Sequence, residues 1–342
     1  MTQIQIDYDF SPEVIDRQKI GLLSDLQTAF TQRNGQGLLL VDPAVFLDTR
    51  QVAELPAAIL AHQPAAIPTQ IKHPRFESRY SPWLIPLDIN RSEDADLLAL
   101  SVMQALQESD PAELMARRGR MVCGWLFSAS PALAIAQHIG MTAVQTLSWV
   151  RQIVLRFYDP TVNNAIWPLL DSWQRSRLLG PLTDWYLTDG DGQLLYRDNT
   201  QSAREQYTFS LALAPEKVKE IIWAGPMNRA LCRYRQVHRN QLRRPESEAR
   251  HIMLALLRRV TARYAFNAVQ DLETCALHGL LYHPEIDLHP RIQSLLSSEQ
   301  GDSFGGYGER TNRLTAEEWQ VLARECGHLN VSVISSENKE IS

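Results

Sequence analysis

A serine near the C-terminus lies in a pattern associated with nucleophilic catalysis. Residues 301–305, Gly-Asp-Ser-Phe-Gly, match G-x-S-x-G, which in serine hydrolases needs a buried strand before the serine and a helix directly after it. Here residues 292–298 have a helical pattern, and Gly-Tyr-Gly-Glu follows the motif. We therefore expect a loop around Ser303 and keep a serine hydrolase as an alternative function.

Two further groups of side chains have the chemistry of metal ligands but not the spacing. The first group is Cys275, His278, His283 and His289, and the second is Asp189 and Asp191. The spacings in the first group fit no usual zinc pattern. The second group lacks the bidentate acidic residue that follows at a fixed distance in a calcium-binding loop. We expect no metal, no cofactor and no catalytic residue.

Arginines gather between Asn228 and Tyr264, where ten arginines and two glutamates give a local charge of +8. The whole chain has a net charge of -5, so the remainder carries -13. Like charges four residues apart on a helix repel each other, so acidic partners are expected. Candidate partner-binding residues are Arg229, Arg233, Arg235, Arg239, Arg258, Arg259 and Arg263.

Three interpretations of these arginines remain open. The first is pairing with acidic side chains of the preceding domain, the second is a face for an acidic partner protein, and the third is binding of nucleic-acid phosphates. The third is disfavoured, because few stacking aromatic residues are interleaved and the chain as a whole is acidic. We expect no nucleic-acid partner, and we keep an arginine-rich nucleic-acid-binding module as an alternative.

Apolar surfaces for a protein partner are predicted in two places. One is the proline-rich segment from Ile59 to Phe76, and the other is a helix that carries Leu277, Leu280 and Leu281. A protein that binds partners tends to expose larger apolar patches than an ordinary monomer.

The elements that position these residues fall into two parts. Strands are predicted at 37–41, within 83–87, at 121–127 and at 153–158, and a hairpin at 184–197 turns at Asp-Gly-Asp-Gly. Helices are predicted at 94–107 and 130–147, the second with Ser130 as N-cap, and the stretch from Pro56 to Pro86 is predicted as mostly loop. The pattern predicts an α/β lobe, a mixed sheet flanked by helices, followed by an all-helical lobe.

Domain boundaries follow from this change of character. We predict an α/β domain over residues 1–205, a helical lobe over 206–332 and a polar tail over 333–342. The start of the chain has no secretory signal pattern, no apolar run is long enough to span a membrane, and the four cysteines form no CxxC pair. We expect a cytoplasmic protein with no membrane partner.

Four short segments occur in order along the first part: Ser81–Asp88 (SPWLIPLD), Gly124–Ser130 (GWLFSAS), Leu155–Pro160 (LRFYDP) and Leu179–Trp185 (LGPLTDW). Asp159 and Pro160 have the chemistry of a helix N-cap and first helical residue, and Arg156 can pair with Asp159. We predict mainly structural roles for the motif residues, which are Trp83, Trp125, Arg156, Phe157, Tyr158, Asp159, Pro160, Gly180, Pro181 and Trp185.

Together these segments resemble the uncharacterised-domain family found in effector chaperones, or adaptors, of the type VI secretion system. The resemblance covers about residues 37–197. It implies a non-enzymatic protein that binds a cognate effector in the cytoplasm and delivers this toxin to the VgrG spike protein. The order of the strands and the identity of the effector stay open at this point.

Overall fold

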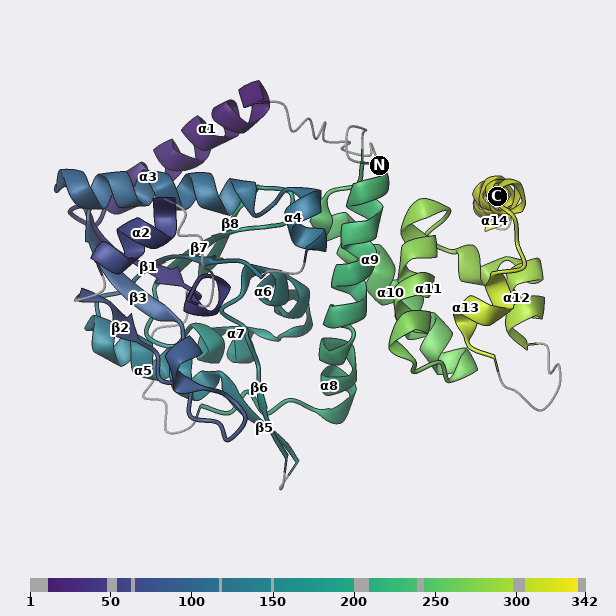
Figure 1. Cartoon of the computed structure of the whole chain (residues 1–342). Helices are drawn as coiled ribbons and strands as arrows, with labels where there is room; N and C mark the ends of the chain where they lie inside the picture. The colour runs from purple at the N-terminus through teal and green to yellow at the C-terminus, as the bar shows by residue number, and fades with distance from the viewer. Residues whose placement is uncertain are drawn as a thin grey trace. The chain divides into compact units, whose positions relative to one another are not determined.

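Six strands form one sheet in the order β2-β3-β1-β4-β7-β8, and every pairing in it is antiparallel (Figure 1). In this computed structural model the strands are β1 (Gln36–Val41), β2 (Ile67–Pro68), β3 (Trp83–Asp88), β4 (Val122–Phe127), β7 (Asp184–Thr188) and β8 (Leu194–Asp198). The structure describes residues 12–47, 54–62, 65–116, 119–148, 151–199, 209–238, 243–297 and 305–337. The α/β fold class with a helical second part is confirmed.

Apolar side chains alternate between the two faces of the central strands, and helices cover both faces of the sheet. Leu39 and Val41 of β1 face a core shared with α1 (Pro12–Thr31), α2 (Glu54–Ala61) and α3 (Ser92–Gln107). Leu38 and Leu40 face a second core, shared with α5 (Ala132–Thr142), α6 (Pro160–Ile166) and α7 (Ser172–Leu179). All six residues of β4 are buried, as expected for a strand covered on both sides.

Two local predictions are wrong and a third is incomplete. Residues 54–61 form α2, which overlaps the start of the stretch predicted as mostly loop, and Pro56 is tolerated because it lies in the first helical turn, where no N–H partner is needed. The N-cap of α5 is Pro131, without a side-chain cap from Ser130. Helix α5 ends at Thr142 instead of 147, because the chain continues directly into β5.

Strands β5 (Val144–Ser148) and β6 (Arg151–Val154) form a separate two-stranded hairpin that extends away from the main sheet (Figure 1). The strand predicted over 153–158 is therefore shorter and lies outside the six-stranded sheet. Leu155 to Tyr158 leave the strand and turn toward the core, where Phe157 is fully buried.

The chain divides into two compact units after Ile221. The sheet unit, defined here as the described residues up to Ile221, also holds α4 (Pro111–Met115) and most of α8 (Pro215–Ile222). The boundary predicted at 205/206 falls before α8. No helix in the described part of the chain is both long enough and apolar enough to cross a membrane.

The helical unit, defined here as the described residues from Ile222 onward, has its own apolar core. Its helices are α9 (Ala224–Val237), α10 (Glu246–Tyr264), α11 (Val269–Leu281), α12 (Pro290–Ser297), α13 (Tyr307–Thr311) and α14 (Ala316–Glu337). Helix α14 runs to Glu337, into the stretch predicted as a polar tail from 333.

Candidate functional site

The Arg156 side chain links the third motif segment to the end of β1. Its guanidinium nitrogen Nη2 lies 2.6 Å from Asp42 Oδ2 and 3.7 Å from Asp159 Oδ2. Asp42 is 2% exposed at its side chain, whereas Arg156 is 43% exposed. Burial raises the pKa of Asp42, although Arg156 opposes this effect. The predicted pairing with Asp159 is present, but the closer partner is Asp42, a residue that the sequence did not single out.

Asp159 and Asp42 also start helical turns. Asp159 Oδ1 accepts a hydrogen bond from Thr161 N–H at 2.9 Å, and Pro160 is the first residue of α6. Asp42 Oδ1 accepts from Ala44 N–H at 3.0 Å. The prediction that Asp159 and Pro160 form a cap is confirmed. These contacts hold two chain segments at one end of the sheet and leave only Arg156 partly open to solvent.

Two tryptophans and a glycine fix the centre of the sheet. Trp125 Nε1 donates to Ser101 Oγ at 3.0 Å, and Trp185 Nε1 donates to the Cys123 carbonyl at 3.2 Å. Gly124 has φ +134°, and a Cβ there would overlap the Tyr186 carbonyl and the Trp185 ring. This glycine permits a backbone conformation that L side chains rarely adopt.

The remaining motif residues also have packing or capping roles. Gly180 ends α7 with φ +57°, and a Cβ on it would collide with the His138 ring. The Pro181 carbonyl accepts a hydrogen bond from Ser128 Oγ. Trp83 is half-buried, with its ring 5.9 Å from that of Phe46. Tyr158, like Phe157, is buried. The motif residues therefore build the scaffold of the sheet unit.

Part of this scaffold matches a known protein family. Residues 45–177 match the family model described as a domain of unknown function, DUF4123. This segment spans 133 of the 342 residues and includes β3, β4, α5 and the β5–β6 hairpin. No curated protein and no solved structure matches the chain. Because β4 pairs with β1 and β7, the DUF4123 segment is completed here by strands outside the matched residues.

A groove of about 1100 Å³ lies mostly along the DUF4123 segment, over the ends of β1, β3 and β4. Its lining includes Leu38, Pro86 and Leu126, which are aligned across three neighbouring strands. His62 and Asp94 also line it, and His62 Nε2 lies 3.2 Å from Asp94 Oδ1. The groove combines apolar residues with charges of both signs, which suits part of a protein chain. The predicted apolar segment from Ile59 to Phe76 contributes Ala61, His62 and Ala65 to this lining, whereas the sequence did not indicate the residues from β1, β3 and β4.

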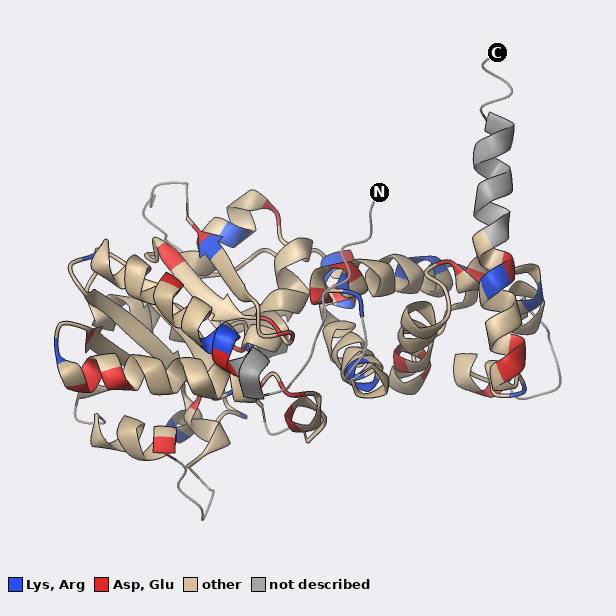
Figure 2. Cartoon of the chain, turned by 90° about the horizontal axis from the view of Figure 1, so that it is seen from above, with Lys and Arg blue, Asp and Glu red and all other residues tan. Residues whose placement is uncertain are grey.

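Several arginines of α9 and α10 have ion-pair partners within the helical unit itself. Glu273 lies 2.7 Å from Arg229 and 3.4 Å from Arg233, and Asp287 lies 2.7 Å from Arg259. Figure 2 shows residues of both charges on the helices of the helical unit. The first interpretation placed the acidic partners in the preceding domain, but these pairs join helices of one unit.

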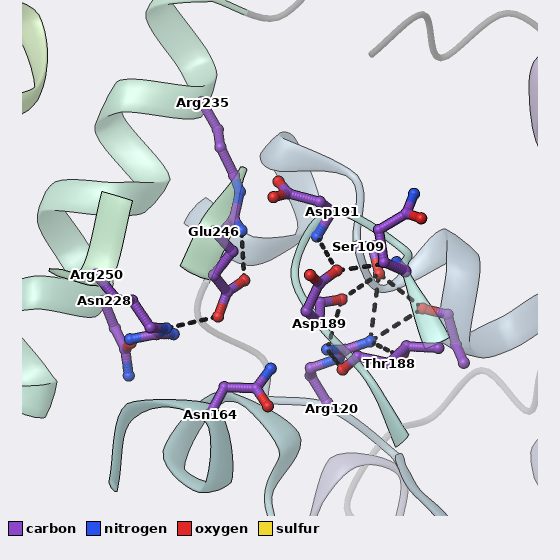
Figure 3. A network of polar contacts seen from close by, with 12 residues as sticks. Ser109, Arg120, Asn164, Thr188, Asp189, Asp191, Asn228, Arg235, Glu246 and Arg250 are labelled. Atoms are coloured by element: carbon purple, nitrogen blue, oxygen red, sulfur yellow. Dashed lines mark hydrogen bonds and ion pairs between the residues drawn. The ribbon is translucent and has the colours of Figure 1, made fainter. Parts of the chain in front are cut away.

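Glu246 receives two guanidinium groups at once. Arg235 Nη2 lies 2.5 Å and Arg250 Nε 2.6 Å from its carboxylate oxygens (Figure 3). The other predicted arginines differ in setting. Arg258 and Arg263 are exposed, the latter 5.5 Å from the Tyr264 ring centroid, and Arg239 lies outside the described residues.

The predicted apolar partner surface on α11 is wrong. Leu277 and Leu280 are each only 5% exposed, and Leu281 packs partly buried against the same core. They face α9, α10 and the later helices, because α11 is the central helix of this unit. The proline-rich segment is mixed, since Ile59 and Ile71 are buried whereas Leu60 is 37% exposed.

The candidate catalytic and metal residues are placed as follows. Ser303 lies outside the described residues. His278 Nδ1 lies 3.2 Å from the Tyr307 hydroxyl, and burial lowers the pKa of His278 to about 4. His289 Nε2 lies 2.9 Å from Glu325. Burial raises the pKa of the Cys275 thiol. Each of these described groups is thus engaged in packing or in a hydrogen bond.

A buried arginine that the sequence did not indicate supports the β7–β8 hairpin. Arg120 donates to the carbonyls of Thr188 at 2.8 Å and Asp189 at 3.1 Å, and also to Ser109 Oγ at 3.2 Å (Figure 3). Asp189 Oδ1 in turn accepts from the N–H groups of Asp191 and Gln193 at the turn. The only sequence signal was a single arginine directly before an apolar strand.

Proposed function

We propose that this chain is a non-enzymatic adaptor that binds a cognate type VI secretion effector in the cytoplasm and delivers it to the VgrG spike protein. The observation that carries the proposal is the match of residues 45–177 to the DUF4123 family. Three of the four motif segments that resemble the effector chaperones lie within this match. The family resemblance supplies the role, and the structure supplies surfaces that suit it.

The motif residues support this proposal as scaffold and not as reacting groups. Trp125, Phe157 and Trp185 are each at most 1% exposed, and Asp159 caps a helix. Binding specificity then belongs to surfaces that the scaffold presents. Two candidates are the groove over β1, β3 and β4, for an apolar segment of a partner, and the exposed Arg258 and Arg263 of α10, for an acidic surface.

Affinity purification of the tagged full-length chain from its own host tests the proposal. We expect mass spectrometry to identify one toxin-like effector together with a VgrG protein. Recovery of neither protein, in a host that expresses its secretion system, would overturn the adaptor role. Ser303→Ala should leave both recoveries unchanged, and loss of effector killing with intact binding in that variant would favour the hydrolase alternative.

Nucleic-acid binding is separated by its dependence on salt. An arginine-rich phosphate-binding site loses affinity steeply as the salt concentration rises. We expect no gel shift with DNA or RNA at physiological salt. A shift that is lost in the Arg258→Ala, Arg259→Ala, Arg263→Ala triple variant would instead assign the arginines to nucleic acid.

A further inference from the structure

The six-stranded sheet ends in two edge strands of different character. At one edge, β2 has two residues and includes Pro68, which has no N–H to donate. Shortness and proline are the usual means by which a sheet edge is protected from pairing with another chain. At the other edge, β8 has five residues, contains neither proline nor lysine, and pairs with β7 without a bulge. Only one of the two edges is protected in this way.

The register of the β7–β8 hairpin shows which backbone groups of β8 point outward. Asp189 N–H donates to the Gln193 carbonyl at 3.0 Å, and Asn199 N–H donates to the Thr183 carbonyl at 3.0 Å. Residues with inward-facing backbone groups alternate along an antiparallel strand. The N–H and C=O groups of Leu194, Tyr196 and Asp198 therefore point away from β7, and these N–H groups have no hydrogen-bond partner among the described residues.

The side chains of these same residues define what could pair with them. Leu194 packs partly buried on the α1–α3 side of the sheet, and Tyr196 lies on the same face, 49% exposed, with its ring 5.0 Å from Tyr186. Asp198 is exposed and has no ion-pair partner in the described part of the chain. Directly opposed residues on a sheet face contact each other, and apolar or oppositely charged pairs are favourable.

We propose that the free edge of β8 binds an extended segment of the cargo protein by strand addition. The segment pairs with the outward backbone groups of Leu194, Tyr196 and Asp198, and its alternate residues are apolar opposite the first two and basic opposite the third. Strand addition takes its affinity from main-chain hydrogen bonds and its specificity from alternate side chains. This inference rests on the proposed adaptor function and assigns one surface to it.

A synthetic peptide tests the edge independently of any cargo. The probe is acetyl-Thr-Lys-Thr-Val-Thr-Val-Thr-amide, and amide hydrogen exchange of the full chain is followed by NMR. We expect the amides of Leu194, Tyr196 and Asp198 to exchange rapidly in the free chain and to become protected by the probe. Asp198→Lys should weaken binding of this peptide about tenfold. The same variant should prefer a peptide that has Glu in place of its Lys. Absence of protection at millimolar peptide would overturn the proposal.

Two other occupants give distinct results. Protection of the three amides in the free monomer would show that the chain covers its own edge. A concentration-dependent dimer that is lost in Tyr196→Pro would assign the edge to a second copy of this chain. Either result overturns binding of cargo at β8.

Purification from the host tests the same edge with the natural cargo. Tyr196→Pro removes an outward N–H and no backbone hydrogen bond to β7, but it also removes the hydrogen bond from the Tyr196 hydroxyl to Asp184 of β7. Tyr196→Thr is the matched control, since it loses the same phenol ring and its hydroxyl but keeps the N–H. We expect effector recovery to fall about tenfold or more in the proline variant and to fall much less in the threonine variant. Equal exchange protection of β7 in both variants shows that the sheet is intact; if the proline variant unfolds, Asp198→Lys takes its place.

The outcomes separate the inference from the adaptor function. Equal effector recovery by the wild type and by an intact Tyr196→Pro overturns the strand addition and leaves the adaptor function standing. Protection of β8 by the probe, with no effector recovered by the wild type, supports the edge as a peptide site and overturns the adaptor function.

Discussion

Glu108, at the end of α3, should make the stability of the sheet unit depend on pH near neutrality. Its carboxyl accepts hydrogen bonds from Met121 N–H at 2.9 Å, Val122 N–H at 3.3 Å and the Gln104 side-chain amide at 3.0 Å. Burial raises the pKa of Glu108 from 4.5 to about 7, because desolvation outweighs the attraction of Arg120 and these hydrogen bonds. The group therefore titrates near neutral pH.

The direction and size of the effect follow from linkage. Since the pKa is higher in the folded chain, the folded state binds more protons than the unfolded state between pH 4.5 and about 7. The stabilising effect is fully present below pH 4.5 and is lost as the pH rises through about 7. The difference between the two pKa values corresponds to about 3 kcal/mol at pH 8.

The substitution Glu108→Gln removes this titration and keeps the size of the side chain. We would measure the free energy of opening of β4 by amide hydrogen exchange at pH 5 and pH 8, corrected for intrinsic rates. Between these pH values the free energy of opening should fall by about 2.5 kcal/mol more in the wild type than in the variant. Glu77→Gln, at a side chain that is 69% exposed, controls for the loss of one negative charge. An equal change in wild type and Glu108→Gln would refute the assignment.

Three further perturbations address other parts of the chain. The pH dependence that His278 causes has the opposite sign, because burial lowers its pKa from 6.5 to about 4. The free energy of unfolding of the helical unit should be highest above pH 6.5 and fall by about 3 kcal/mol toward pH 4. Amide exchange of α11 should show this fall in the wild type and a smaller fall in His278→Gln. Gly124→Ala should destabilise the sheet unit by about 2 kcal/mol or more in chemical denaturation, because Gly124 has a positive φ and a Cβ there would overlap the Tyr186 carbonyl. Gly21→Ala is the control: its Cβ would meet open space, so it should stabilise α1 by about 0.5–1 kcal/mol. Equal effects of the two substitutions would contradict the clash at Gly124. In urea unfolding, Leu280→Ala should lower the free energy of unfolding by about 2–5 kcal/mol. Leu288→Ala, at a side chain that is 45% exposed, should lower it by no more than about 0.5 kcal/mol. A Leu280→Ala variant that is as stable as the wild type but binds its partner weakly would restore the predicted α11 surface.

Local signals in the sequence predicted elements well where one short segment carried all the information. The hairpin at Asp189–Gly192 forms as expected, because the Asp189 side chain accepts two backbone N–H groups within the turn. The stop at Gly180 likewise needs only a residue that accepts a positive φ. The buried strand over 122–127 followed from an uninterrupted apolar run.

Predictions failed where a segment had two locally acceptable structures. The apolar stretch after Thr142 suits a helix or a strand, and pairing of Val144 with Val154 in a hairpin decided for the strand. Ser130-Pro131 has the composition of a helix cap, yet Ser128 takes the local hydrogen bond from Ser130 N–H. Propensity is a weak guide in such places, because tertiary contacts outweigh it.

The sequence by itself determined the α/β and helical parts, the caps at Asp159 and Gly180, and the resemblance that matches the DUF4123 family. Each depends on residues that are neighbours in the chain or on a hydrophobic period. The tertiary structure alone decided that Arg156 pairs with Asp42, 114 residues away, and that Leu280 lies in a core. It also decided that β8 forms an edge of the sheet whose outward N–H groups have no partner among the described residues, because strand order and register depend on contacts between segments that no local pattern specifies.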